Sequence, residues 1–159
     1  MKITLITVGK IKEKYFTDAI AEYSKRLSRY CKLEILEVPD EKTPDNASEA
    51  QENQIREREG DRVKKLLKDS AYTIALAIDG KAMTSEAFAA RIERLGVAGE
   101  SHICFLIGGS LGMSESLLKC ADERISFSRM TFPHQLMRVI LLEQIYRGFR
   151  IMNHEPYHK

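Results

Sequence analysis

The chain has 159 residues, of which 43% are hydrophobic and 30% charged, a balance typical of one soluble domain with a core of its own. Its formal net charge is only +2, so bulk charge does not indicate nucleic-acid binding and any basic surface must be local. Three widely spaced cysteines match neither a disulfide framework nor a zinc pattern, which favours a reduced, cytoplasmic setting. We find no signal peptide and no apolar run long enough to cross a membrane.

Apolar runs that end near glycine or proline predict strands over residues 1–9, 33–38, 72–78, 102–107 and 124–128. Between them the pattern predicts helices over residues 12–30, 48–68, 84–96 and 114–120, and a last helix that starts at Pro133.

The third strand is expected to end at Asp79-Gly80, while Thr84 and Ser114 are expected to cap the helices that follow them. The densely charged segment 48–68 is interpreted as a mostly solvated helix. Strands that alternate with helices indicate an α/β fold with a mainly parallel sheet. The pattern by itself suggests an ordinary doubly wound sheet, whose ligand site would lie in the loops after Ile78, Ile107 and Ser128.

The last helix is apolar on more than one face, a pattern that one core has difficulty covering. Its apolar residues are Leu136, Met137, Val139, Ile140, Leu141, Leu142, Ile145, Tyr146, Phe149 and Met152. A homodimer interface is the preferred interpretation. Complete burial within one chain is the alternative.

Two short motifs have competing interpretations. The loop Gly108–Gly112 follows a strand and could let a cofactor approach the backbone, but it matches no dinucleotide or Walker pattern and could equally be a tight turn. The segment His154–His158 has the spacing of a zinc-binding HExxH motif, but Pro156 disrupts the helix which that motif requires. No metal site is predicted.

Four blocks together resemble a known family: Val8–Tyr15 (VGKIKEKY), Ile107–Gly112 (IGGSLG), Phe127–Arg147 (FSRMTFPHQLMRVILLEQIYR) and Tyr157–Lys159 (YHK). Their order and spacing resemble the RlmH family, bacterial SPOUT-class methyltransferases that act on 23S ribosomal RNA. The resemblance covers essentially residues 1–159. It implies methyl transfer from S-adenosylmethionine to N3 of a pseudouridine, in a homodimer whose C-terminal part forms a deep trefoil knot.

The resemblance also implies which residues bind the cofactor. They are Leu76, Gly108, Phe127, Ser128, Arg129, Met130, Thr131 and Phe132. Leu76 would lie in a buried strand, Gly108 would leave room for the ligand against the main chain, and 127–132 would wall the adenine.

Methyl transfer to a pyrimidine N3 requires removal of its proton, and His134 and His158 are the candidates for that base. Tyr157 could stack on the base and Arg138 could neutralise a developing negative charge. We expect the tail to complete the pocket of the partner subunit, and the substrate to be 23S rRNA within the assembled ribosome. Two alternatives stay open: a SPOUT methyltransferase for another RNA such as tRNA, and a non-catalytic nucleotide-binding assembly module.

Overall fold

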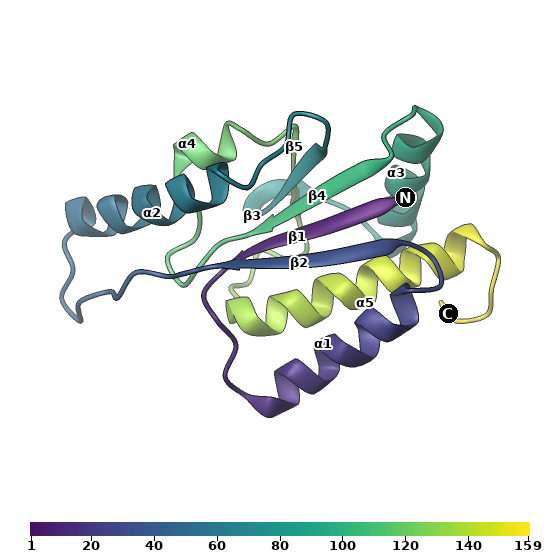
Figure 1. The fold of residues 1–159 in the computed structure, drawn as a ribbon, viewed down its shortest axis with the longest axis horizontal. Coiled ribbons are helices and arrows are strands. Elements are labelled where there is room, and N and C mark those ends of the chain that lie inside the picture. The colour runs from purple at the N-terminus through teal and green to yellow at the C-terminus, as the bar shows by residue number, and fades with distance from the viewer.

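The computed structural model describes all 159 residues as five strands and five helices around one sheet (Figure 1). The strands are β1 (Lys2–Val8), β2 (Lys32–Val38), β3 (Tyr72–Ala82), β4 (His102–Ile107) and β5 (Glu123–Ser126). They lie in the order β2-β1-β4-β3-β5, and every neighbouring pair is parallel. The prediction of an α/β fold with a parallel sheet is therefore confirmed.

Helices cover both faces of the sheet (Figure 1). One layer contains α1 (Lys14–Leu27), α3 (Ser85–Val97) and α5 (His134–Met152), and α5 packs against both of the others. The other layer contains α2 (Glu49–Lys64) and the short α4 (Glu115–Leu118), which pack against each other.

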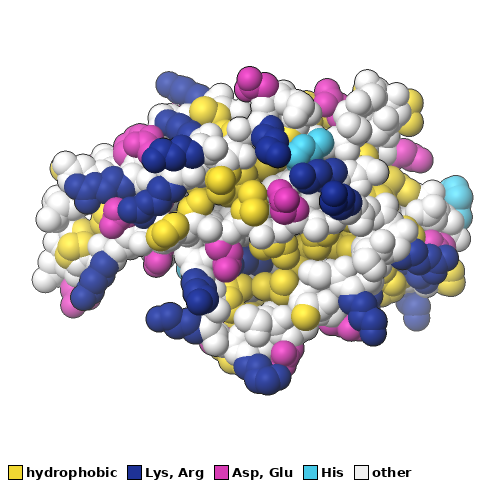
Figure 2. All heavy atoms as spheres, in the orientation of Figure 1, with side chains coloured by type: hydrophobic (Ala, Val, Ile, Leu, Met, Phe, Trp, Pro, Cys, Tyr) yellow, Lys and Arg dark blue, Asp and Glu magenta, His cyan; other side chains and the backbone are white.

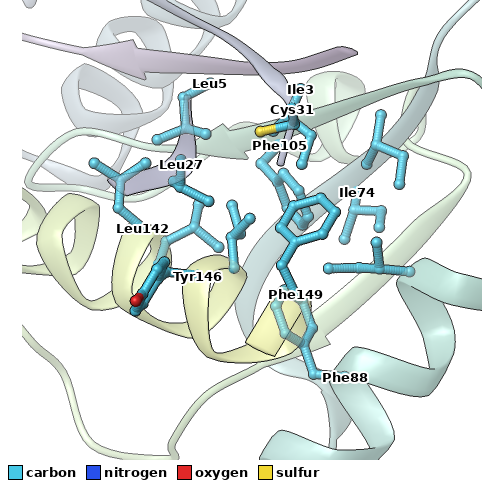
Figure 3. Close-up of a cluster of buried hydrophobic side chains, with 14 of the residues drawn as sticks. Ile3, Leu5, Leu27, Cys31, Ile74, Phe88, Phe105, Leu142, Tyr146 and Phe149 are labelled. Carbon is cyan, nitrogen blue, oxygen red and sulfur yellow. The ribbon is translucent and has the colours of Figure 1, made fainter. Parts of the chain in front are cut away.

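Alternating strand residues fill two hydrophobic clusters on opposite faces of the sheet. Leu5 of β1 belongs to the larger cluster, beneath α5, whereas its neighbour Ile6 belongs to the cluster beneath α2 and α4. Figure 3 shows Leu5 and Phe105 of the strands and Tyr146 of α5 as members of this larger cluster. Continuous apolar runs are thus explained by strands that are buried on both faces.

Local capping chemistry sets where several helices begin. The hydroxyl of Thr84 accepts the N–H of Ala87 at 3.1 Å, and Ser114 accepts the N–H of Leu117 at 3.2 Å, so both predicted caps are confirmed.

The third strand does not end at Asp79-Gly80, so that prediction is wrong. β3 continues to Ala82 through an irregularity, because both Leu76 and Lys81 pair with Ile125 of β5. A Cβ on Gly80 would lie 2.6 Å from the carbonyl carbon of Ile125. Gly80 thus marks a close approach between two strands rather than a turn.

Candidate active site

A cavity of about 880 Å³ opens at the carboxyl edge of the sheet. It is lined by the ends of β3 and β4, by the segment after β5 and by the first turn of α5. The three places that the strand pattern singled out, after Ile78, Ile107 and Ser128, therefore do meet around one cavity, although the residues after Ile78 belong to β3 and not to a loop.

The glycine turn, Gly108–Gly112, forms one wall of this cavity. The N–H of Gly112 donates to the carbonyl oxygen of Gly109 at 3.0 Å, and Gly112 has a φ of 81°. A Cβ on Gly108 would lie 2.8 Å from the carbonyl carbon of Gly112. Glycine at position 108 is therefore required for the turn to close on itself, a different reason from room for a ligand.

The segment between β5 and α5 forms a second wall, and short hydrogen bonds shape it. The Ser126 hydroxyl donates to the carbonyl oxygen of Ser128 at 2.9 Å, and the N–H of Met130 donates to the Ser128 hydroxyl at 3.0 Å. The ring of Phe127 meets Phe88 of α3 edge-on, with 5.7 Å between ring centroids. These contacts hold the segment in one conformation beside the cavity.

Seven of the eight residues proposed to bind a cofactor line the cavity: Leu76, Gly108, Phe127, Ser128, Met130, Thr131 and Phe132. Arg129 is exposed and does not line it. The apolar walls and the main chain of the glycine turn fit the adenosyl part of the expected S-adenosylmethionine, and Asp79 lines the same cavity.

His134, the first residue of α5, also lines the cavity. Its Nδ1 is buried and has no hydrogen-bond partner. Burial lowers the pKa of this imidazole, the positive charge of Arg138 lowers it further, and Asp40 partly opposes them. His134 is therefore neutral at physiological pH, the state in which an imidazole can accept a proton.

Arg138 lies beneath the site and does not line the cavity. Its side chain is 2% exposed and pairs with Glu37 at 2.6 Å. It also donates to the carbonyl oxygens of Gly9 at 2.6 Å and Val8 at 3.1 Å. In this position Arg138 ties the end of β1 to α5 and has no free face for a substrate.

The tail residue Tyr157 docks on α5, outside the cavity lining. Its hydroxyl donates to Glu143 at 3.1 Å, and its ring meets Tyr146 edge-on at 5.0 Å. Burial, together with the bond to Glu143, raises the pKa of Tyr157 to about 12. The phenol therefore stays protonated at neutral pH, which suits stacking or hydrogen-bond donation and excludes a role as general base.

His158 is held by both ring nitrogens. Nε2 lies 2.6 Å from Oε1 of Glu86 at the start of α3, and Nδ1 lies 3.2 Å from a guanidinium nitrogen of Arg147. Since a guanidinium only donates, Nδ1 accepts and Nε2 carries the hydrogen that is donated to Glu86. The structure thus brings His158 and Tyr157 together, but apart from His134 of the same subunit.

Sequence reasoning missed the partners of the tail, which are Glu143 for Tyr157 and Glu86 for His158. These partners lie far from the tail along the chain, so no local pattern could have joined them. Asp79, which lines the cavity, could have been found from its place directly after an apolar run. No group of three or more His, Cys, Asp or Glu residues is placed to share a metal ion.

A family model described as "Predicted SPOUT methyltransferase" matches residues 1–158. The "Ribosomal RNA large subunit methyltransferase H" of Bifidobacterium adolescentis is 65% identical over 159 residues, which is all of both chains. The protein of the same name from Clostridium beijerinckii is 62% identical, again over all of both chains.

Among solved structures, a probable methylase family protein from Haemophilus influenzae has a similar fold. The TM-score is 0.54 at 12% sequence identity, and the match covers 99% of this chain and 70% of the other.

Proposed function

Because the chain belongs to the SPOUT methyltransferase family, we propose that it transfers a methyl group from S-adenosylmethionine to N3 of a pseudouridine in 23S ribosomal RNA. The choice of ribosomal RNA as substrate is supported by the full-length identity of 65% to a ribosomal RNA large subunit methyltransferase H. The observation that supports the cofactor is the cavity at the carboxyl edge, whose lining includes seven of the eight expected residues.

S-adenosylmethionine supplies the methyl group on a cationic sulfonium. The chain's part is to orient that group and to keep water away from it. Leu76 and Phe127 provide apolar contact for the adenosyl part, and the glycine turn provides backbone groups. Arg129, which is exposed, lies at the rim of this arrangement and is free to contact RNA phosphate.

The pyrimidine proton is removed by a histidine. We assign this step to the partner's His158, with His134 of the cavity as the second candidate. His134 already lines the cavity in the neutral form, whereas His158 is held away from it within its own subunit. A tail that crosses to the second subunit would bring both groups to one site. Tyr157 would travel with it and stack on the nucleotide.

The outer face of α5 supports a homodimer. Leu136, Val139 and Ile140 are only partly buried, while Leu141 and Leu142 on the inner face are fully buried. Near the cavity Met130 is 71% exposed and Ile78 is 53% exposed. A second copy placed against α5 would cover these apolar side chains.

We further propose that residues 1–159 form a single domain and that the chain after β4 is threaded as a trefoil knot. The turn after β4 and the segment after β5 both line the cavity. A knotted path would fix these turns relative to each other more firmly than ordinary loops could be fixed.

The charge distribution supports a folded ribosomal particle as substrate. Figure 2 shows lysine and arginine side chains scattered over the visible face, with carboxylates among them. No helix of the structure is long and apolar enough to span a membrane. Weak attraction for free RNA follows from this mixed surface, so recognition would depend on shape in the cytoplasmic ribosome.

The proposal is tested by methyl transfer from labelled S-adenosylmethionine to 70S ribosomes, isolated subunits, naked rRNA and tRNA, with the modified nucleotide mapped. We expect label on one pseudouridine of 23S rRNA, strongest with the whole ribosome. Label on tRNA would show instead that tRNA is the substrate. Bound cofactor without any transfer would favour the non-catalytic module.

A further inference from the structure

Glu59 is a buried carboxylate on a helix whose other charged side chains are exposed or only partly buried. Glu59 lies in α2, is 4% exposed and does not line the cavity. Its Oε2 accepts the backbone N–H of Glu41 at 2.9 Å. Glu59 thus joins α2 to the loop that connects β2 with α2.

The same carboxylate fills the space in which residue 109 would carry a side chain. A Cβ on Gly109 would lie 3.2 Å from Oε1 and 3.4 Å from Oε2 of Glu59, and 3.2 Å from a methyl carbon of Val8. The φ of Gly109 is not positive, so its backbone conformation does not call for glycine. The crowding behind the turn, to which Glu59 contributes two of the three nearest atoms, explains the glycine instead.

Gly109 lines the cavity. On the side where a side chain would stand, it lies against the carboxylate of Glu59. We propose that Glu59 is a positioning residue for the cofactor: its carboxylate supports the glycine turn from behind and holds it where it binds S-adenosylmethionine. This inference rests on the proposed function, because it requires that the cavity takes that cofactor.

The charges around Glu59 make its burial costly. Burial raises the pKa of Glu59, and the hydrogen bond from Glu41 opposes the rise. The carboxylates of Asp40 and Glu41 and the guanidinium of Arg62 face it from the β2–α2 loop and from α2 itself. A carboxyl group in such surroundings weakens the fold, so a role in positioning accounts for its presence better than stability does.

A double-mutant cycle tests the proposal. The dissociation constant for S-adenosylmethionine is measured by calorimetry in the wild type, Glu59→Ala, Gly109→Ala and the double variant. We expect Gly109→Ala to weaken binding about tenfold, because its Cβ pushes on the Glu59 carboxylate. In the double variant the methyl group occupies the vacated space, so binding is expected to recover by about threefold or more relative to Gly109→Ala alone.

Two controls separate this from a general effect on folding. Glu59→Gln keeps the volume and should not restore binding to Gly109→Ala, and Glu57→Ala, an exposed carboxylate on the same helix, should not restore it either. Thermal unfolding of each variant shows that the chain is folded, and Glu59→Ser takes the place of Glu59→Ala should that variant fail to fold. Glu59→Ala alone should also weaken binding, because the turn loses the carboxylate behind it. The proposal is overturned if Glu59→Ala alone leaves the dissociation constant unchanged, or if the single effects simply multiply. Absence of cofactor binding by the wild type would instead overturn the proposed function, and this inference with it.

Discussion

The guanidinium carbon of Arg147 lies 4.7 Å from the centre of the Tyr157 ring. The same guanidinium pairs with Glu143 at 2.5 Å and contacts His158. One arginine on α5 therefore organises both polar aromatic residues of the tail. These contacts hold the tail in a defined position on α5, the helix that we propose as the dimer interface.

Deletion of Tyr157–Lys159 is expected to reduce methylation of the ribosome by about a hundredfold or more, the usual contribution of a positioned acid or base. Dimerisation and the affinity for S-adenosylmethionine should stay near their wild-type values, because the deleted residues do not line the cavity of their own subunit. Methylation assays, sedimentation and calorimetry check the three parts. Loss of the folded state would contradict this prediction.

Glu155 anchors the tail to the body of the protein. Its carboxylate accepts from the Tyr30 hydroxyl at 2.8 Å and pairs with Arg150 at 3.0 Å. Glu155→Ala should release the tail and lower the turnover rate by about tenfold, since hydrogen bonds to charged groups contribute about 1.5–3 kcal/mol. Hydrogen exchange of residues 153–159 should rise with it. Glu22→Ala, which removes a surface pair with Arg26, serves as the control and should change neither quantity.

His134 should make stability depend on pH. Its pKa is lowered from 6.5 in the folded protein, mainly by burial. The unfolded chain therefore binds the proton more readily, so the stability contribution is complete above about pH 6.5 and is lost as the pH falls through the folded pKa. Urea unfolding between pH 7.5 and 5 should show a shallower loss for His134→Gln than for the wild type. Equal slopes would contradict the prediction, and the exposed His154→Gln is the control.

Charge placed on the outer face of α5 should separate the subunits. Leu136→Asp and Ile140→Asp put a carboxylate where we expect a second copy, and desolvating an unpaired charge costs several kcal/mol. Sedimentation should show monomers, and methylation should be lost with the shared site. Val97→Asp on α3 introduces the same charge at a residue that is 85% exposed and should leave the dimer intact. Dimeric Leu136→Asp and Ile140→Asp would point to a different interface.

Features that depend on nearby residues were predictable from the sequence. Thr84 and Ser114 cap their helices through N–H groups three residues away. The apolar composition of strand segments such as His102–Ile107 already indicates that they are buried. The position of the cavity followed from the rule that parallel strands present their carboxyl ends at one edge. These inferences need no knowledge of distant contacts.

The remaining features depend on segments that meet only in the folded chain. β3 passes Gly80 because β5 lies against it, and β5 comes more than forty positions later in the sequence. Residue type and spacing also could not place Arg138, because its partners are Glu37 in β2 and Gly9 directly after β1, about a hundred or more positions earlier in the chain. Glu59 looked like one charge among many on a solvated helix until the glycine turn was placed beside it.

The first strand occupies the inside of the sheet, between β2 and β4. Lys2 of β1 is paired with His102 of β4. The hydrogen bonds on this side of β1 therefore cannot form until the ribosome has synthesised β4, about a hundred residues later. During synthesis the amino-terminal segment would leave the ribosome with an open edge and no partner on one side. Such distant pairing is typical of slow folding, so the nascent chain should reach its native sheet only near the end of translation.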